Sequence, residues 1–151
     1  NNPWFEYNES DGKYYRFQYG GKHNGDSGQI AVRNVIFQYV EWGHYASTDY
    51  LNINVHKGGA GYVFTGGKCV PVFWKKDGDF GPTRYYDSEG KEVMLNKGKT
   101  WICIVGADRF DKAEIYGSNR QKKKKESNFV VQGSILAVAS IVVRIIGIAY
   151  R

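Results

Sequence analysis

Short hydrophobic runs, separated by glycine and aspartate turns, make up most of this chain. The runs are rich in aromatic and β-branched side chains, and many alternate with polar residues, which is the pattern of β-strands. No amphipathic helix is indicated before Gly106, and one helix is predicted near 108–116. The pattern therefore predicts an all-β domain.

Two hairpins are indicated by glycine turns between hydrophobic runs. The first spans 4–19 and turns at Asp11-Gly12, and the second spans 62–74 and turns at Gly66-Gly67. Pro71, in the second hairpin, has no N–H to donate to a strand ladder, so we expect a sheet edge or a bulge there.

Two further runs differ in which faces they can bury. The run 29–42 has apolar residues at both odd and even positions, which predicts a strand in the centre of a sheet. The run 50–55 alternates cleanly, with Leu51, Ile53 and Val55 on one side, as in a half-buried strand.

The stretch 83–105 is the most sharply punctuated part of the chain. Turns at 87–90 and 96–98 separate three strand-like runs, so a three-strand meander is predicted. The last run, 100–105, is apolar at both parities and is expected to be buried on both sides.

The character of the chain changes after this stretch. Residues 118–128 are polar and charged, and 129–150 contain one base, Arg144, and no acid. As a helix this segment would be about 33 Å long, enough to cross a bilayer core of roughly 30 Å. A transmembrane helix is favoured over the alternative, a buried helix of a soluble domain.

These patterns define the expected fold and domains. We expect a mainly β fold, an antiparallel sheet or sandwich or a partly open barrel of about seven to nine strands. A separate hydrophobic C-terminal helix follows. The domain covers 1–108, a charged linker 109–128, and the hydrophobic segment, expected to be truncated, 129–151.

Charge is divided unevenly between these parts. The formal net charge is +6, but residues 1–117 hold 14 Lys and Arg against 14 Asp and Glu. The basic excess lies in the tail, where seven bases accompany Glu126. A nucleic-acid-binding domain concentrates positive charge on its folded face, so no nucleic-acid partner is expected.

The two cysteines, Cys69 and Cys103, leave two alternatives open. They could form a disulfide if their strands were neighbours in an oxidising compartment. Otherwise they are buried free thiols that pack as small hydrophobic side chains.

A set of short motifs between residues 14 and 105 carries a family resemblance. The motifs are Gly21-Lys22-His23 with Asp26, Asn34-Val35-Ile36, Gly61-Tyr62-Val63-Phe64 with Gly67-Lys68, Trp74-Lys75-Lys76, Pro82-Thr83-Arg84-Tyr85-Tyr86-Asp87, Gly90-Lys91-Glu92, Leu95-Asn96 and Gly98-Lys99-Thr100-Trp101-Ile102. In their order and spacing they resemble the C-terminal domain of the YerB-like lipoproteins, a bacterial family of unknown function.

This resemblance implies an extracytoplasmic, membrane-anchored protein with a further N-terminal domain, of which Asn1 would begin a fragment. It implies no activity. Phe73 replaces a small polar residue of the family pattern, and neither cysteine belongs to that pattern.

The tail resembles a different family. Lys122–Lys125 and the apolar segment after them are similar to the amino-terminal start and first membrane helix of a polysaccharide flippase. The positive-inside rule places these lysines in the cytoplasm, whereas a lipoprotein domain lies on the other side of the membrane. A joined reading of two genes or an unusual fusion would explain the conflict.

Motifs for chemistry are sparse. The three histidines lack metal-ligand spacing, and no nucleophile-elbow, Walker or dinucleotide motif occurs. We therefore expect no cofactor, no metal and no enzymatic activity in this chain. His23 and Asp26, in one glycine-rich loop, are a candidate binding pair, with turn stabilisation as the alternative.

A second candidate binding set lies at the ends of two strands. Aromatic and charged side chains there could hold a glycan or a peptide, with Trp74 and Trp101 as core residues in the alternative. The set comprises Trp74, Lys75, Lys76, Arg84, Tyr86 and Asp87. The expected function is a non-enzymatic binding or scaffold domain of the cell envelope, contacting a protein or glycan. The alternative is a fragment of a lipid-linked saccharide flippase, with 129–151 in the membrane.

Overall fold

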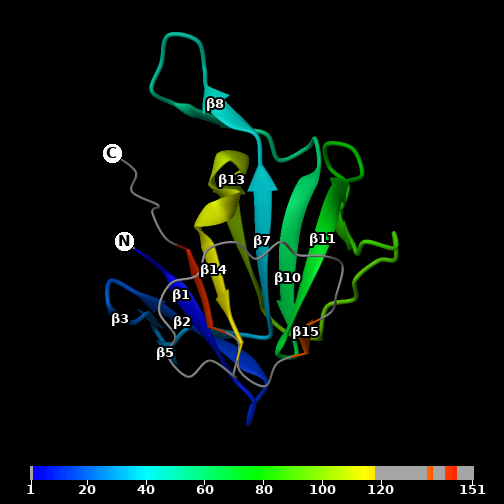
Figure 1. The fold of residues 1–151 in the computed structure, drawn as a ribbon. Coiled ribbons are helices and arrows are strands. Elements are labelled where there is room, and N and C mark those ends of the chain that lie inside the picture. Colours follow the sequence, from blue (N-terminus) through cyan, green and yellow to red (C-terminus); the bar gives the residue numbers. More distant parts are fainter. Residues whose placement is uncertain (1, 118–135, 138–141, 146–151) are drawn as a thin grey trace.

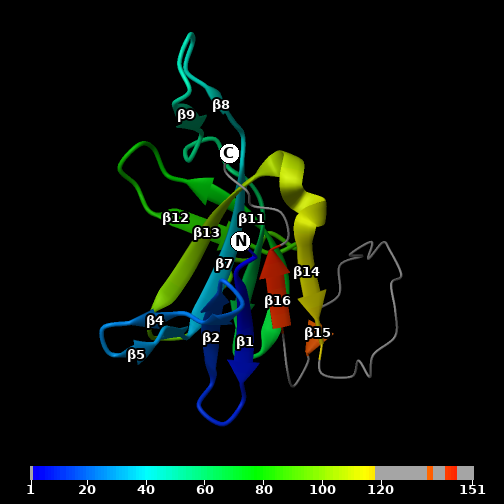
Figure 2. The same ribbon diagram turned by 90° about the vertical axis from the view of Figure 1, so that its left-hand side faces the viewer.

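The computed structural model describes residues 2–117, 136–137 and 142–145. They form two β-sheets that face each other, with a hairpin that projects from one end (Figures 1 and 2). The mainly β prediction is confirmed, and among the described strands no sheet closes into a barrel.

The first sheet contains both ends of the described chain. Its strands, in spatial order, are β14 (Ala113–Tyr116), β16 (Val142–Ile145), β1 (Trp4–Asn8), β2 (Lys13–Gln18) and β3 (Gly21–Lys22), with β6 (Ala31–Val32) also paired to β2. The predicted hairpin at Asp11-Gly12 is confirmed, since β1 and β2 pair antiparallel. Gly12 takes a φ of 65°, the conformation for which its turn needs glycine.

The second sheet holds the longest strands. In spatial order they are β12 (Thr83–Tyr86), β11 (Lys68–Lys76), β10 (Gly59–Thr65), β7 (Asn34–Val40) and β13 (Thr100–Gly106), with β15 (Leu136–Ala137) paired to β11. The β10–β11 hairpin and the central position of β7 match their predictions. The outer side of β11 at Pro71 lies between the residues paired with β15 and those paired with β12, and within the described part of the chain no strand pairs with it there.

Two smaller hairpins and one helix complete the described elements. The hairpins are β4 (Asn24–Gly25) with β5 (Gly28–Gln29), and β8 (Trp42–His44) with β9 (Leu51–Ile53). A short 3₁₀ helix, η1 (Ala107–Lys112), leads from β13 to β14. The helix predicted near 108–116 is therefore a 3₁₀ helix followed by a strand.

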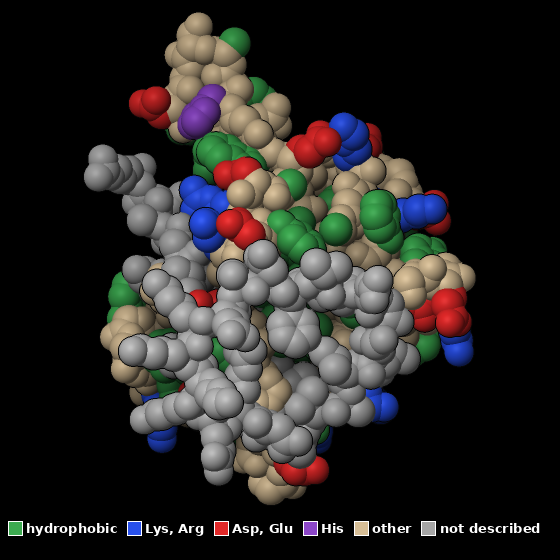
Figure 3. All heavy atoms as spheres, viewed as in Figure 1, with side chains coloured by type: hydrophobic (Ala, Val, Ile, Leu, Met, Phe, Trp, Pro, Cys, Tyr) green, Lys and Arg blue, Asp and Glu red, His purple; other side chains and the backbone are tan. Residues whose placement is uncertain are grey.

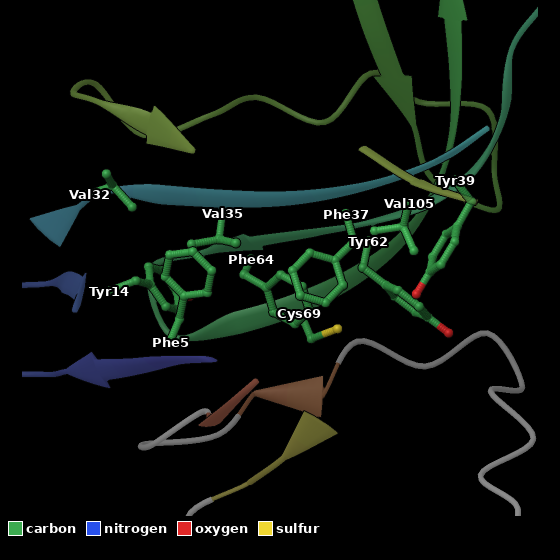
Figure 4. Close-up of a cluster of buried hydrophobic side chains, with 10 residues drawn as sticks. All are labelled: Phe5, Tyr14, Val32, Val35, Phe37, Tyr39, Tyr62, Phe64, Cys69 and Val105. Carbon is green, nitrogen blue, oxygen red and sulfur yellow. The ribbon is translucent and has the colours of Figure 1, made fainter. Parts of the chain in front are cut away.

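Alternate side chains of β7 build two hydrophobic clusters, one on each face of the second sheet. Val35 and Phe37 point toward the first sheet and meet Phe5 and Tyr14 there (Figure 4). Ile36 and its neighbours on the opposite face are covered by Trp74, Tyr85 and Val93. Every residue of β7 is buried as a result.

Close packing over β10 explains one of its glycines. Trp74 is fully buried, and its Nε1 donates to the carbonyl of Tyr39 at 2.9 Å. A Cβ on Gly59 would lie 3.1 Å from this Nε1 and 2.8 Å from the Tyr39 oxygen. Only glycine leaves the indole room to reach its acceptor.

The meander predicted over 83–105 is wrong. β12 and β13 lie at opposite edges of the second sheet, and residues 87–99 cross from one edge to the other. In that connection the predicted middle strand is reduced to a bridge between Tyr86 and Glu92 and a hydrogen bond from Val93 N to Tyr85 O. β13 then pairs parallel to β7.

Burial of β13 on both sides is also wrong. Val105 is buried, but Ile102 and Ile104 on the other face are 48% and 39% exposed. Apolar residues at both odd and even positions allow a strand to be buried on both faces. They do not require it, and in β13, an edge strand, the side chains of one face remain exposed to solvent.

The half-buried strand predicted at 50–55 is corrected as well. Leu51 and Ile53 are 38% and 41% exposed, because β8 and β9 project away from both sheets (Figure 1). Hydrophobic side chains lie on the surface of this hairpin (Figure 3). The alternation of apolar and polar residues in this hairpin therefore does not show whether a second layer covers its apolar face.

Most of the predicted C-terminal helix lies outside the described residues. The parts of 129–151 that are described, β15 and β16, are strands paired with β11 and with β1 and β14. Within the described residues, no helix has the length and apolarity to cross a membrane.

We expect Asn34→Ala to lower the free energy of unfolding by about 2–4 kcal/mol, because four buried hydrogen bonds are lost. The side chain of Asn34 is fully buried and bonds to Thr65, Asn96 and Thr100. Urea unfolding measures the change as a shift of the midpoint at constant slope. Asn52→Ala on exposed β9 is the control, expected within about 0.5 kcal/mol of the wild type; equal effects of the two would contradict the role of Asn34.

Candidate functional site

The structure gives the residues predicted at the end of β11 and β12 mainly structural contacts. Trp74 is in the core, as its alternative reading expected. Arg84 Nη1 contacts both carboxylate oxygens of Glu92 at 2.9 and 3.1 Å, which raises the pKa of the arginine further. Asp87 Oδ1 accepts from the backbone N–H groups of Glu89 and Lys91, both at 3.0 Å, and so stabilises its turn.

Two members of that set keep surface positions. Lys75 is exposed, and its Nζ lies 5.9 Å from the ring centre of half-buried Tyr86. Arg84 and Lys75 are opposite one another in the β11–β12 register. The strands thus bring Lys75 and Arg84 together, but Arg84 already has an acidic partner in Glu92.

The two residues of the other predicted pair, His23 and Asp26, have different surroundings in the structure. Asp26 is exposed at the turn between β4 and β5. His23 lies between β3 and β4, and its backbone bonds to Arg16 and Ile30. Its ring meets Trp101 edge-on, with ring centres 6.5 Å apart, and its Nδ1 contacts Arg16 Nη1.

These contacts lead to a residue that the sequence did not single out, Arg16. It lies on β2 and is only 8% exposed. Its guanidinium carbon is 4.5 Å from the ring centre of Trp101 and 5.9 Å from that of Phe5, so the cation lies against two aromatic rings. Such contacts stabilise a cation without neutralising its charge.

The hydrogen bonds of Arg16 are incomplete. Nη1 donates to Gln18 Oε1 at 2.5 Å and contacts His23 Nδ1, but Nε is buried and has no acceptor. Among the described residues no hydrogen bond from Nη2 and no ion pair of Arg16 occurs. Among the described residues this edge of the fork therefore has no acceptor, and Nε itself is enclosed by protein.

Burial makes this cation costly. Desolvation lowers the pKa of Arg16, with Cys103 and Tyr19 acting in the opposite direction. Arginine ordinarily titrates so far above neutrality that the group stays charged. A buried charge normally has a counter-ion, because burial without one costs several kcal/mol. An anion at the free edge of the fork would supply the missing partner.

Backbone strain occurs beside the same group. Tyr19 has a φ of 54°, a left-handed conformation that costs a residue with a Cβ about 1 kcal/mol or more. Its side chain is 81% exposed, so no packing repays the cost within the described residues. The β2–β3 turn thus presents the exposed aromatic side chain of Tyr19, three residues after Arg16.

One sequence signal could have identified Arg16. Tyr14 and Arg16 share one parity on β2, and Tyr14 belongs to the core between the sheets. An arginine in the inward row of a strand is unusual. The sequence shows this parity, but not that Trp101, 85 positions later in the chain, lies over the guanidinium.

Both thiols are free, and the fold excludes their pairing. Cys69 on β11 and Cys103 on β13 are separated by β10 and β7, a spacing of about 14 Å at the usual distance between strands. Burial raises the pKa of each thiol to about 12. In the described part of the chain, no group of three or more His, Cys, Asp or Glu side chains is arranged to hold a metal ion.

The fold and this site define a two-layer β domain with a buried arginine that has no acidic partner among the described residues. Residues 1–102 match the C-terminal domain of DUF3048, a protein of unknown function, and the chain therefore belongs to this family.

A solved structure with a similar fold is that of YerB from Bacillus subtilis, with a TM-score of 0.61 and 21% sequence identity. The match covers 69% of this chain and 40% of YerB, so the chain spans less than half of that protein's length. The YerB-like resemblance is confirmed at the level of family and fold. No curated protein matches the chain.

We expect both thiols to react very slowly with Ellman's reagent in the native protein at pH 8. At a pKa of about 12, about one thiol in ten thousand is ionised at that pH, against about one in ten at the ordinary value of 9. The same protein in guanidinium chloride provides the control, with two thiols per chain reacting rapidly. Cys69 is buried and Cys103 half-buried, and fast native modification of either would contradict its raised pKa.

Proposed function

We propose that this chain is a non-enzymatic binding domain of the bacterial cell envelope, and that Arg16 binds an acidic group of its ligand. The observation that carries the proposal is the buried guanidinium with no acidic partner among the described residues. Arginine donates charge-assisted hydrogen bonds to carboxylate, and Nη2 has no acceptor among the described residues.

The surroundings of Arg16 favour binding. Trp101 holds one face of the guanidinium, while Gln18 and His23 hold Nη1, so the fork is fixed before a ligand arrives. A fixed donor pair loses little conformational entropy on binding. Preorganisation of this kind strengthens recognition of a planar anionic group.

The nearby thiol supports a binding role in preference to nucleophilic chemistry. Cys103 neighbours Arg16, but its pKa is raised to about 12 by burial. A nucleophilic cysteine needs a lowered pKa, so that the thiolate is present near neutral pH. Arg16 therefore acts on a ligand without activating Cys103.

The resemblance to YerB-like lipoproteins supports the proposed envelope location. Acidic groups are abundant there, in peptides and in wall polymers, and both offer oxygen acceptors for Arg16. The alternative, a flippase fragment, depends on residues 122–151 alone. Pairing of β15 and β16 with strands of the domain favours the binding proposal over that alternative.

We expect Arg16→Gln to weaken binding of the full chain to isolated envelope fractions by about tenfold or more, because a charge-assisted contact is lost. Cell-wall sacculi and solubilised envelope proteins are tested separately by co-sedimentation and pull-down. Lys57→Gln, which removes the same charge at an exposed position in the loop before β10, should bind within about twofold of the wild type.

Arg84→Gln tests the set of residues at β11 and β12 in the same assay. A loss with Arg84→Gln but not with Arg16→Gln would move the site and overturn the assignment of Arg16. Urea midpoints of all three variants show whether a loss reflects unfolding. Failure of the wild type to bind either fraction would overturn the proposed function.

A further inference from the structure

The outer edge of β13 is open among the described strands. β13 is the last strand of the second sheet and pairs on one side with β7 (Figure 2). Within the described part of the chain, no backbone hydrogen bond reaches its other side. Half of the N–H and C=O groups of this seven-residue strand are thus free to pair with another extended chain.

This edge lacks the features that usually protect a sheet. Thr100–Gly106 contains no lysine, no other charged residue and no proline. Natural proteins place such residues on edge strands to prevent pairing with other chains. Ile102 and Ile104 are also 48% and 39% exposed along this strand. A long, uncharged, apolar edge is suited to strand addition.

A cation marks one end of the same edge. Trp101 is the second residue of β13, and its ring lies against the guanidinium of Arg16. An acidic group bound by Arg16 therefore lies near the first residues of β13. In a strand added to this edge, a carboxylate at the end of the chain is the group that would reach it.

We propose that the ligand is an extended peptide with a free C-terminal carboxylate, which adds to the outer edge of β13 and places that carboxylate on Arg16. The inference rests on the proposed function and identifies the ligand class of its site. The carboxyl end lies at the start of β13, so the peptide runs antiparallel to β13.

The register of such a pair predicts the sequence of the ligand. Residues directly opposite each other in a ladder point to the same face of a sheet. With the last peptide residue opposite Trp101, the second and fourth residues from the end lie opposite Ile102 and Ile104. Apolar side chains at these two positions would cover the exposed isoleucines, whereas the third from the end faces the side of Cys103.

The experiment screens the full chain against hexapeptide libraries that carry either a free or an amidated C-terminus. We expect peptides with apolar residues second and fourth from the free end, and a loss of affinity of about tenfold or more on amidation. Fluorescence anisotropy of a labelled selected peptide should show a similar loss for Arg16→Gln.

Ile104→Lys tests the edge independently of the carboxylate. A charge in the apolar row should weaken peptide binding by about tenfold, as lysine protects natural edges. Leu51→Lys is the matched control, because Leu51 is 38% exposed on the projecting β9 and lies opposite His44. The control should bind as the wild type does.

A nitroxide at the peptide's amino end reports the direction of the added strand. Antiparallel addition should broaden the amide signals of Val105 and Gly106, at the end of β13, more than that of Trp101. The reverse order would overturn the antiparallel arrangement. Equal binding of free and amidated peptides would overturn the role of Arg16 in peptide capture.

Two other outcomes separate this inference from the proposed function. Binding to sacculi that depends on Arg16, without selection of any peptide, would overturn the peptide ligand and leave the binding domain in place. Sedimentation of the full chain as a dimer that Ile104→Lys dissociates would show instead that a second copy occupies the edge. Loss of Arg16 dependence in every assay would overturn both proposals.

Discussion

Hydrogen bonding by the buried side chain of Asn34 fixes the arrangement on which the second sheet depends. Its Oδ1 accepts from Thr65 Oγ1 at 2.6 Å and from Asn96 N at 3.1 Å, and its Nδ2 donates to Asn96 O at 2.9 Å and to Thr100 Oγ1 at 3.0 Å. All donors and acceptors of the amide are used. One side chain thus joins the start of β7, the end of β10, the 87–99 connection and the start of β13.

The Arg16 site depends on this constraint. Thr100, held by Asn34, precedes Trp101, whose ring must face the first sheet to meet the guanidinium. A shift of β13 by one residue would turn Trp101 to the opposite face and bring Ile102 under Arg16. The polar network at one end of the sheet therefore sets which side chain the cation contacts.

Local features of the fold could be predicted from the sequence, and long-range ones could not. The turns at Asp11-Gly12 and Gly66-Gly67 encode hairpins because their strands are adjacent in the chain. The position of β13 depends on Asn34, which lies far from it in the sequence and has no hydrophobic pattern. For the same reason the turns within 83–105 predict a meander that the structure does not contain.

The candidate site shows the same division. His23 could be selected from its glycine-rich loop, but its contacts with Arg16 and Trp101 come from three separate segments. Arg84 and Asp87 looked available because the sequence shows charges and not their partners. Glu92 and the backbone of the following turn satisfy them in the structure.

The parallel pairing of β7 with β13 has a kinetic consequence. Asn34 and Thr100 are 66 residues apart, whereas each hairpin closes over a few residues. Loop-closure entropy must be overcome before so distant a contact stabilises the chain, so hairpins form early and the β13 edge late. During translation β7 therefore has an unpaired side until residue 100 and those after it arrive, and a chain interrupted before that point exposes a strand that is fully buried in the native domain, which favours aggregation.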